Sequence, residues 1–236
     1  MKRSALYYFV MLMTFFSITS LSAEVKGRVD AGPVWMRIKM KAEEKTVRRA
    51  DMWGGRFDLL LLPLQGCDYV SGLCLKPFVF GGRGDDTSLL SWGCGFGHYT
   101  PITDRITIVP LVGVSRTYLH STIDVPIPEL NSVFKNQKDR IHSLTFYIGG
   151  DAIFKITENL YFTAMYTYGW ARVRTRIGGF INSSGSSEGS NIGGMLEYYF
   201  TNCFSANIAF AYNTTLDEYK NGIDGYGFKL GLAYLF

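Results

Sequence analysis

The feature that most constrains this chain is a two-residue repeat of apolar side chains at its C-terminus. From position 226 to position 236 every even position holds an aromatic residue or a leucine, while glycine, alanine and lysine hold most of the odd positions. A period of two is that of an extended strand, whose alternate side chains face opposite sides. Segments 160–170 and 203–213 show the same alternation. The chain is therefore expected to be all-β.

Ten strand-like segments of this kind follow one another, separated by turn signals. Each is about as long as the 9–11 residues with which a tilted strand crosses a membrane, or somewhat longer. The expected strands cover residues 25–38, 51–62, 73–82, 89–99, 105–118, 141–156, 160–172, 191–200, 203–213 and 225–236.

The connections between these segments alternate in length. Short links at 100–104, 157–159 and 201–202 alternate with long polar links at 39–50, 81–88, 119–140, 177–190 and 214–224, and the longer link 63–72 is an exception on the short side. Short periplasmic turns and long extracellular loops are typical of outer-membrane barrels. In lipid every backbone polar group must be bonded internally, so the sheet must close. The sequence predicts a transmembrane antiparallel up-and-down β-barrel of about ten strands, with eight as the alternative.

The N-terminus has the composition of a secretory signal peptide. Two basic residues at positions 2 and 3 precede an apolar run over residues 6–18, and a small-residue cleavage site ends at Ala23. This stretch is short and wrongly flanked for a spanning helix. We therefore expect residues 1–23 to be a signal peptide and residues 24–236 to form one barrel domain.

Export places the four cysteines in a compartment where disulfides form. Four cysteines allow three pairings, and the sequence selects none of them. Cys67 and Cys74 bracket one turn and are the expected pair, whereas Cys94 and Cys203 belong to distant strands.

The last strand also carries a four-residue pattern. Lys229, Gly231, Tyr234 and Phe236 fill the places of a polar residue, a glycine, an aromatic residue and a terminal aromatic residue. This pattern resembles the insertion signal of bacterial outer-membrane barrels, and the mature chain resembles the small OmpA-like and OmpX-like barrels. The resemblance implies a bacterial outer-membrane location, with membrane lipids, periplasmic chaperones and the barrel-assembly machinery as partners. The cysteines add a weaker resemblance to the cysteine-bridged outer membranes of chlamydia-like bacteria.

Charged residues recur on the strand faces opposite the aromatic residues. A ten-stranded barrel is only slightly wider than an eight-stranded one, whose interior side chains nearly fill it. Charges in so narrow a lumen must be paired or hydrated. We therefore expect a salt-bridge network, a largely closed lumen and at most a small conductance, with a weak preference for anions. The expected lumen charges are Lys26, Arg28, Asp30, Arg56, Asp58, Lys76, Asp151, Lys155, Glu197 and Lys229.

Two surface patterns suggest binding. Arg83-Gly84-Asp85 lies in a Gly-rich link predicted to be extracellular and matches the tripeptide that integrins recognise; the alternative is an ordinary polar turn. Arg172, Arg174 and Arg176 alternate, so they share one side of an extended strand and could hold lipopolysaccharide phosphates. The alternative for these arginines is a solvated strand extension. Host-cell receptors and lipopolysaccharide are therefore candidate partners.

Other functions find little support in the sequence. The formal charge of +4 comes without the basic stripe of a nucleic-acid-binding protein. His98, His120 and His142 lack the aspartate partner of barrel proteases, and the serines that follow the last two face the opposite way in a strand. No cysteine or histidine spacing indicates a metal or cofactor site. We expect a structural, surface-interaction or weak porin-like protein that is not an enzyme; the alternatives are a narrow passive-diffusion porin and an adhesin that uses Arg83-Gly84-Asp85.

Overall fold

The computed structural model describes residues 26–236 except 43, 63–71, 128–131 and 180. The expected signal peptide therefore lies outside the described residues. Within them, no helix is long and apolar enough to cross a membrane. The strands are β1 (Lys26–Ala42), β2 (Lys45–Leu62), β3 (Leu73–Gly84), β4 (Thr87–His98), β5 (Thr100–Thr103), β6 (Ile106–Ile127), β7 (Ser132–Lys155), β8 (Leu160–Ile177), β9 (Ile181–Tyr199), β10 (Phe204–Leu216) and β11 (Gly222–Leu235).

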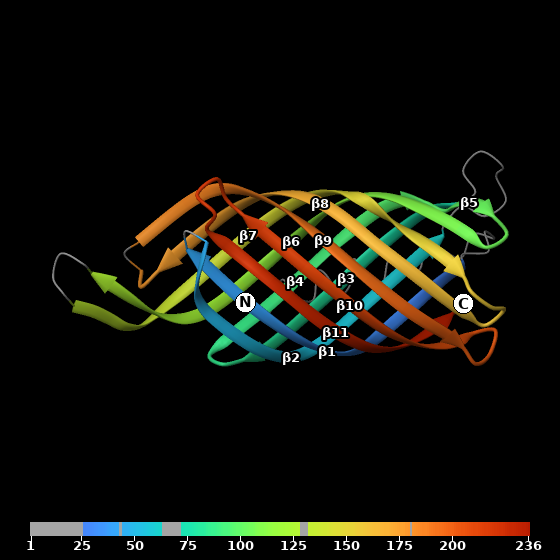
Figure 1. Ribbon diagram of the computed structural model, residues 1–236, viewed down its shortest axis with the longest axis horizontal. Helices are drawn as coiled ribbons and strands as arrows, with labels where there is room; N and C mark the ends of the chain where they lie inside the picture. The colour runs from blue at the N-terminus through green and yellow to red at the C-terminus, as the bar shows by residue number, and fades with distance from the viewer. Residues whose placement is uncertain (1–25, 43, 63–71, 128–131, 180) are drawn as a thin grey trace, which may run out of the picture.

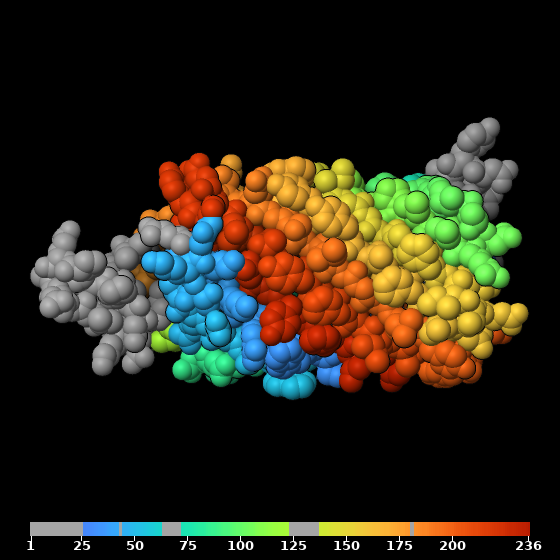
Figure 2. Space-filling view, in the orientation of Figure 1, coloured from blue at the N-terminus to red at the C-terminus, as the bar shows by residue number. Residues whose placement is uncertain are grey.

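These strands form one closed antiparallel sheet whose members are steeply tilted (Figure 1). β1 pairs with both β2 and β11, and β4 pairs with β6, so ten strands complete the ring. The short β5 pairs only with β6 and belongs to the turn before it. At the seam, Gly27 and Phe236 exchange two backbone hydrogen bonds of 2.8 and 3.0 Å, and Figure 2 shows β1 and β11 side by side in a continuous wall. The predicted ten-stranded barrel is confirmed, and the eight-stranded alternative is wrong.

The outside of the barrel carries a band of exposed apolar side chains. Along β8, Phe162, Tyr166 and Trp170 face outward, while Thr163 and Gly169 face the lumen. An outward apolar band edged by aromatic residues is what a lipid bilayer requires of a barrel. Trp53, Trp92 and Trp170 mark its edge at the end away from Lys26 and Phe236. We call that end the outer end, and the end carrying Lys26 and Phe236 the periplasmic end.

The strands are longer at the outer end than the sequence predicts. The expected long loops are mostly strand: β2 begins at Lys45, β6 runs to Ile127 and β9 begins at Ile181. The ribbons of β6 and β7 project furthest (Figure 1). The periplasmic strand ends lie within one residue of the predicted ones.

The physical reason for this extension is an inversion of polarity. Beyond Trp35 on β1, Arg37 and Lys39 face outward, while Met36 and Ile38 face the lumen and are buried. This part of the wall has an apolar interior and a charged exterior, as a water-soluble barrel has. Polarity alone therefore predicts loops at the outer ends of the strands, whereas the polar residues there continue the strands.

Candidate functional site

Three layers of side chains project into the lumen. Reading the inward positions of β2 from the periplasmic end gives Leu62 and Leu60, then Asp58 and Arg56, then Met52. We call these levels the inner apolar layer, the charged layer and the outer apolar layer. The stacking follows from strand alternation, because every second residue of each strand must face the lumen.

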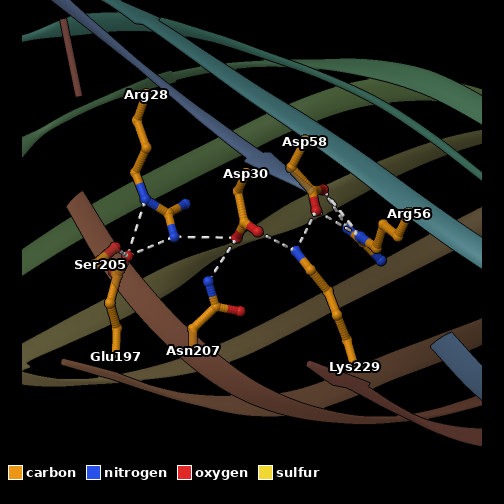
Figure 3. A network of polar contacts seen from close by, with 8 residues as sticks. All are labelled: Arg28, Asp30, Arg56, Asp58, Glu197, Ser205, Asn207 and Lys229. Atoms are coloured by element: carbon orange, nitrogen blue, oxygen red, sulfur yellow. Dashed lines mark hydrogen bonds and ion pairs between the residues drawn. The ribbon is translucent and has the colours of Figure 1, made fainter. Parts of the chain in front are cut away.

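Lys229 stands at the centre of the charged layer (Figure 3). Its Nζ lies 2.8 Å from Asp30 Oδ1 and 3.0 Å from Asp58 Oδ2, and the residue is only 7% exposed. On the other side of Asp30, Arg28 lies 3.0 Å from Asp30 Oδ2 and 2.7 Å from Glu197 Oε1. One chain of ion pairs thus joins β9, β1, β11 and β2.

Further hydrogen bonds link this layer, and the buried Asn207 Oδ1 accepts none from the described residues. Arg56 pairs with Asp58 at 2.7 Å, Asn207 donates to Asp30 at 3.1 Å, and Ser205 donates to Glu197 at 2.5 Å. A separate ion pair joins Lys76 on β3 to Asp151 on β7. Bases and acids are equal in number within these contacts. Buried charges need such pairing, because an isolated charge out of water is strongly unfavourable.

Two expected lumen lysines lie outside these contacts. Lys155 is at the periplasmic end of β7 and Lys26 begins β1. Among the described residues, neither forms an ion pair. The positive surplus expected for the lumen therefore belongs to its periplasmic end, and the charged layer itself is neutral.

The outer apolar layer was not foreseen from the sequence. Met52 and Leu119 are 0% and 1% exposed, and the Ser121 hydroxyl contacts Met40 Sδ at 3.8 Å across the lumen. The alternation of β1 contains the signal for this layer, because its even positions from Val34 to Met40 continue the inward series of Arg28 and Asp30. The layer comprises Val34, Met36, Ile38, Met40, Met52 and Leu119, with Phe80, Leu89, Ile141 and Ile223 packed against them.

The inner apolar layer lies toward the periplasmic end. Buried Cys74, Val109 and Leu111 pack with Leu60, Leu62, Tyr99 and Ile153. Cys74 has a free thiol in this layer, and Cys67, its expected disulfide partner, lies outside the described residues. Cys94 and Cys203 are also free, the latter exposed in the turn before β10.

The four residues of the expected insertion signal have clear structural roles. Lys229 is the centre of the charged layer, and Gly231 leaves room beside it: a Cβ there would lie 2.5 Å from Asn207 Oδ1 and 2.7 Å from Asp30 Oδ1. Tyr234 and Phe236 face outward with ring centroids 6.4 Å apart. One face of β11 thus contacts lipid and the other organises the lumen.

Arg83-Gly84-Asp85 lies at a tight hairpin end, as in the ordinary polar turn that the sequence offers as the alternative to an adhesion loop. Arg83 and Gly84 belong to β3, and only two residues, Asp85 and Asp86, form the turn. Their φ values of 47° and 55° are those of a type I′ turn. The Asp85 carboxylate accepts the backbone N–H of Asp51 at 2.9 Å, so it is already bound to β2.

The three histidines lie at two separate places in the barrel. His98 Nδ1 is 2.9 Å from the Thr100 hydroxyl near the periplasmic end. His120 and His142 face outward at the outer end, with ring centroids 6.1 Å apart. Among the described residues, no group of three His, Cys, Asp or Glu side chains is placed to hold a metal ion.

Comparison with known proteins agrees with the geometry at the level of the fold. No family model and no curated protein matches the sequence. The outer membrane protease OmpT from Escherichia coli is similar in structure, with a TM-score of 0.55, 10% identity, and coverage of 90% of this chain and 96% of that one. An outer membrane channel from Pseudomonas putida F1 gives a TM-score of 0.51 at 10% identity, covering 92% and 97%. A protease and a channel share this architecture, so the likeness identifies the fold alone: the chain is a small barrel of the bacterial outer-membrane type.

Proposed function

We propose that this protein is a sealed, non-catalytic outer-membrane barrel that acts through the surface it presents rather than as a pore. The observation that carries the proposal is the layered lumen. Side chains from seven of the ten barrel strands meet in the outer apolar layer, and Arg28 of β1 reaches Glu197 of β9 in the charged layer. Contacts that cross the lumen at several levels support a lumen without a wide water-filled path.

Two side chains of the charged layer are partly exposed. The side chains of Arg56 and Lys76 are 37% and 32% exposed, although both point inward. Space for water therefore exists between the two apolar layers. Passage of a solute would require both of those layers to part, which disfavours the narrow-porin alternative.

Planar-bilayer recording tests the sealed barrel. We expect the purified, folded protein to give no resolved single-channel steps under conditions where an open porin conducts. Stable, reproducible steps from the wild-type protein would refute the proposal and favour the narrow porin. Protease protection of the protein in vesicles made from the same lipids must confirm that it inserts, so that an absence of current is not mistaken for failed insertion.

The adhesin alternative receives little support from the geometry. Recognition of Arg83-Gly84-Asp85 needs a free carboxylate on an exposed tip, whereas Asp85 bonds to the Asp51 N–H and Arg48 donates to the Asp85 carbonyl at 2.8 Å. We expect Asp85→Glu to leave host-cell adhesion unchanged. A clear loss of adhesion by correctly folded Asp85→Glu cells would restore the adhesin reading.

Partners outside the lumen also belong to the proposal. The strand end at Tyr234 and Phe236 is fully formed and faces outward, which suits recognition by the barrel-assembly machinery after delivery by periplasmic chaperones. The exposed apolar band requires contact with membrane lipids.

A further inference from the structure

The outer ends of β6, β7 and β8 form a strongly basic outer surface. Alternate residues of these strands face outward, and from Arg116, which lies opposite Trp92, to the outer end most of them are arginine, lysine or histidine. We call this surface the basic face. It comprises Arg116, His120, Lys138, Arg140, His142, Arg172, Arg174 and Arg176.

Strand register places these side chains in rows rather than leaving them scattered. His120 lies opposite Arg140, which lies opposite Arg176, so one row crosses three strands. In the next row His142 lies opposite Arg174. Directly opposite residues have Cβ atoms roughly 4.5–5.5 Å apart, and like charges at that distance, here Arg140 and Arg176, destabilise a sheet. A negative charge bound between these arginines would offset that repulsion.

The described part of the chain does not supply that charge on the basic face. None of its arginines or Lys138 lies within ion-pair distance of a described carboxylate. On the other side of the barrel, by contrast, Arg37 pairs with Asp51 at 2.6 Å and Lys41 with Asp224 at 2.5 Å. The nearest acid on β9 is Glu188, which lies opposite Trp170 and so closer to the membrane than the rows.

The surface is also hollowed where the rows meet β9. One hollow of about 400 Å³ is lined by Arg172, Arg174 and residues 184–186. A second, of about 380 Å³, lies between Arg140, Arg174 and Arg176 and is completed by His142, Thr175, Asn182, Ser183 and Ser184. Guanidinium groups bind phosphate oxygens in pairs, and hydroxyl and amide groups add further donors.

The position of the basic face indicates what kind of anion it meets. Trp170 precedes Arg172 by two residues on the same outward side, and its ring stacks with that of Phe146 at 6.5 Å. Such aromatic residues mark the boundary between hydrocarbon and headgroups. The basic face therefore begins where lipid headgroups begin, and it is turned toward the membrane surroundings rather than into the lumen.

We propose that the basic face binds the phosphorylated headgroup of an outer-leaflet glycolipid, with Arg140, Arg174 and Arg176 as its principal phosphate ligands. The site extends the arginines of β8 with residues of β6 and β7 that only the strand register brings together. It does not depend on whether the lumen conducts.

Binding of purified lipid A to the folded mature protein in detergent tests this proposal. The variant Arg140→Gln/Arg174→Gln/Arg176→Gln should bind bisphosphorylated lipid A at least about tenfold more weakly than wild type, since several charge-assisted contacts are lost. A matched control, Lys39→Gln/Lys45→Gln/Arg49→Gln, removes equal charge from the outer ends of β1 and β2 and should bind within about twofold of wild type. Heat-modifiable mobility on gels establishes that each variant is folded.

Two further probes separate a lipid headgroup from other anions. Dephosphorylated lipid A should bind with equal affinity to the wild type and to the Arg140→Gln/Arg174→Gln/Arg176→Gln variant. Heparin, a sulfated glycan, should compete weakly. The proposal would be overturned if the two triple variants lost equal affinity for lipid A, or if removing the phosphates left the affinity for wild type unchanged. It would also be overturned if heparin bound through these arginines more tightly than lipid A.

Discussion

At the scale of single residues, Lys229 is expected to contribute more to the stability of the charged layer than any other single side chain. It neutralises Asp30 and Asp58 at once, and Asp30 is 1% exposed. Replacing it by an apolar side chain removes the shared cation between the two carboxylates and leaves Asp30 paired with Arg28 alone and Asp58 with Arg56 alone. We predict that Lys229→Met lowers the free energy of unfolding by about 3–5 kcal/mol, measured by urea-induced unfolding in lipid vesicles.

Lys155 provides the control for that measurement. It also faces the lumen, on β7, but pairs with no carboxylate among the described residues. Lys155→Met should therefore change the free energy of unfolding by less than about 1 kcal/mol. Equal effects of the two substitutions would mean that the ion pairs contribute nothing beyond a generic loss of charge.

Asp139 gives the outer end of the barrel a dependence on pH. It faces inward on β7 beyond the aromatic row, and its Oδ1 has no hydrogen-bond partner among the described residues. Burial raises the pKa of this carboxyl from 3.8 to about 6. The folded state thus binds the proton more tightly than the unfolded state, so the stabilising effect is complete below pH 3.8 and is lost as the pH rises through 6.

Asp139→Asn removes this dependence. We predict that the variant is more stable than wild type at pH 8, by up to about 3 kcal/mol, and that the difference disappears toward pH 4. Thermal unfolding in micelles over that range measures it. A difference between variant and wild type that is constant with pH would show that the carboxyl does not titrate in this window.

At the scale of elements, closure depends on the pairing of β1 with β11. Gly27 and Phe236 hold its last two backbone hydrogen bonds, and a Cβ on Gly27 would lie 2.4 Å from the Phe236 ring. We predict that Gly27→Val reduces the yield of folded, heat-modifiable barrel severalfold, because either the ring or the strand must move. Gly55→Val is the control: its Cβ would meet nothing nearer than 3.9 Å, and it should fold with nearly the wild-type yield.

The strands also show how far sequence reasoning reaches. Periplasmic ends were predicted to within a residue, because there an apolar strand gives way directly to a short turn. Outer ends were missed by up to ten residues, as at Ile181 on β9. Polarity was used to identify strands, and outside the lipid it no longer distinguishes a strand from a loop. The inward charges could be placed by alternation, but their partners could not, since pairing Arg28 with Glu197 requires knowing that β1 and β9 share one lumen.

At the scale of the whole molecule, the barrel has two different environments along its axis. In the membrane its exterior is apolar, and its lumen holds the charged layer and, toward the periplasmic end, the inner apolar layer. Beyond the membrane its exterior is charged and its lumen apolar, so polarity reverses where the solvent outside changes from lipid to water. The result is two apolar layers that enclose a charged layer with room for water.

This arrangement predicts how the lumen can be opened. Met36→Ala/Met52→Ala/Leu119→Ala thins the outer apolar layer, and Leu60→Ala/Tyr99→Ala/Leu111→Ala thins the inner one. Each set alone should remain silent in planar bilayers, because the other apolar layer still blocks the path. The combined variant should conduct, since the charged layer between them already has space for water. Each substitution costs roughly 2–5 kcal/mol, so recordings must use fractions shown to be folded by heat-modifiable mobility. Conduction by either single set at the level of the combined variant would show that one layer alone seals the barrel, and the layered account of the lumen would then be wrong.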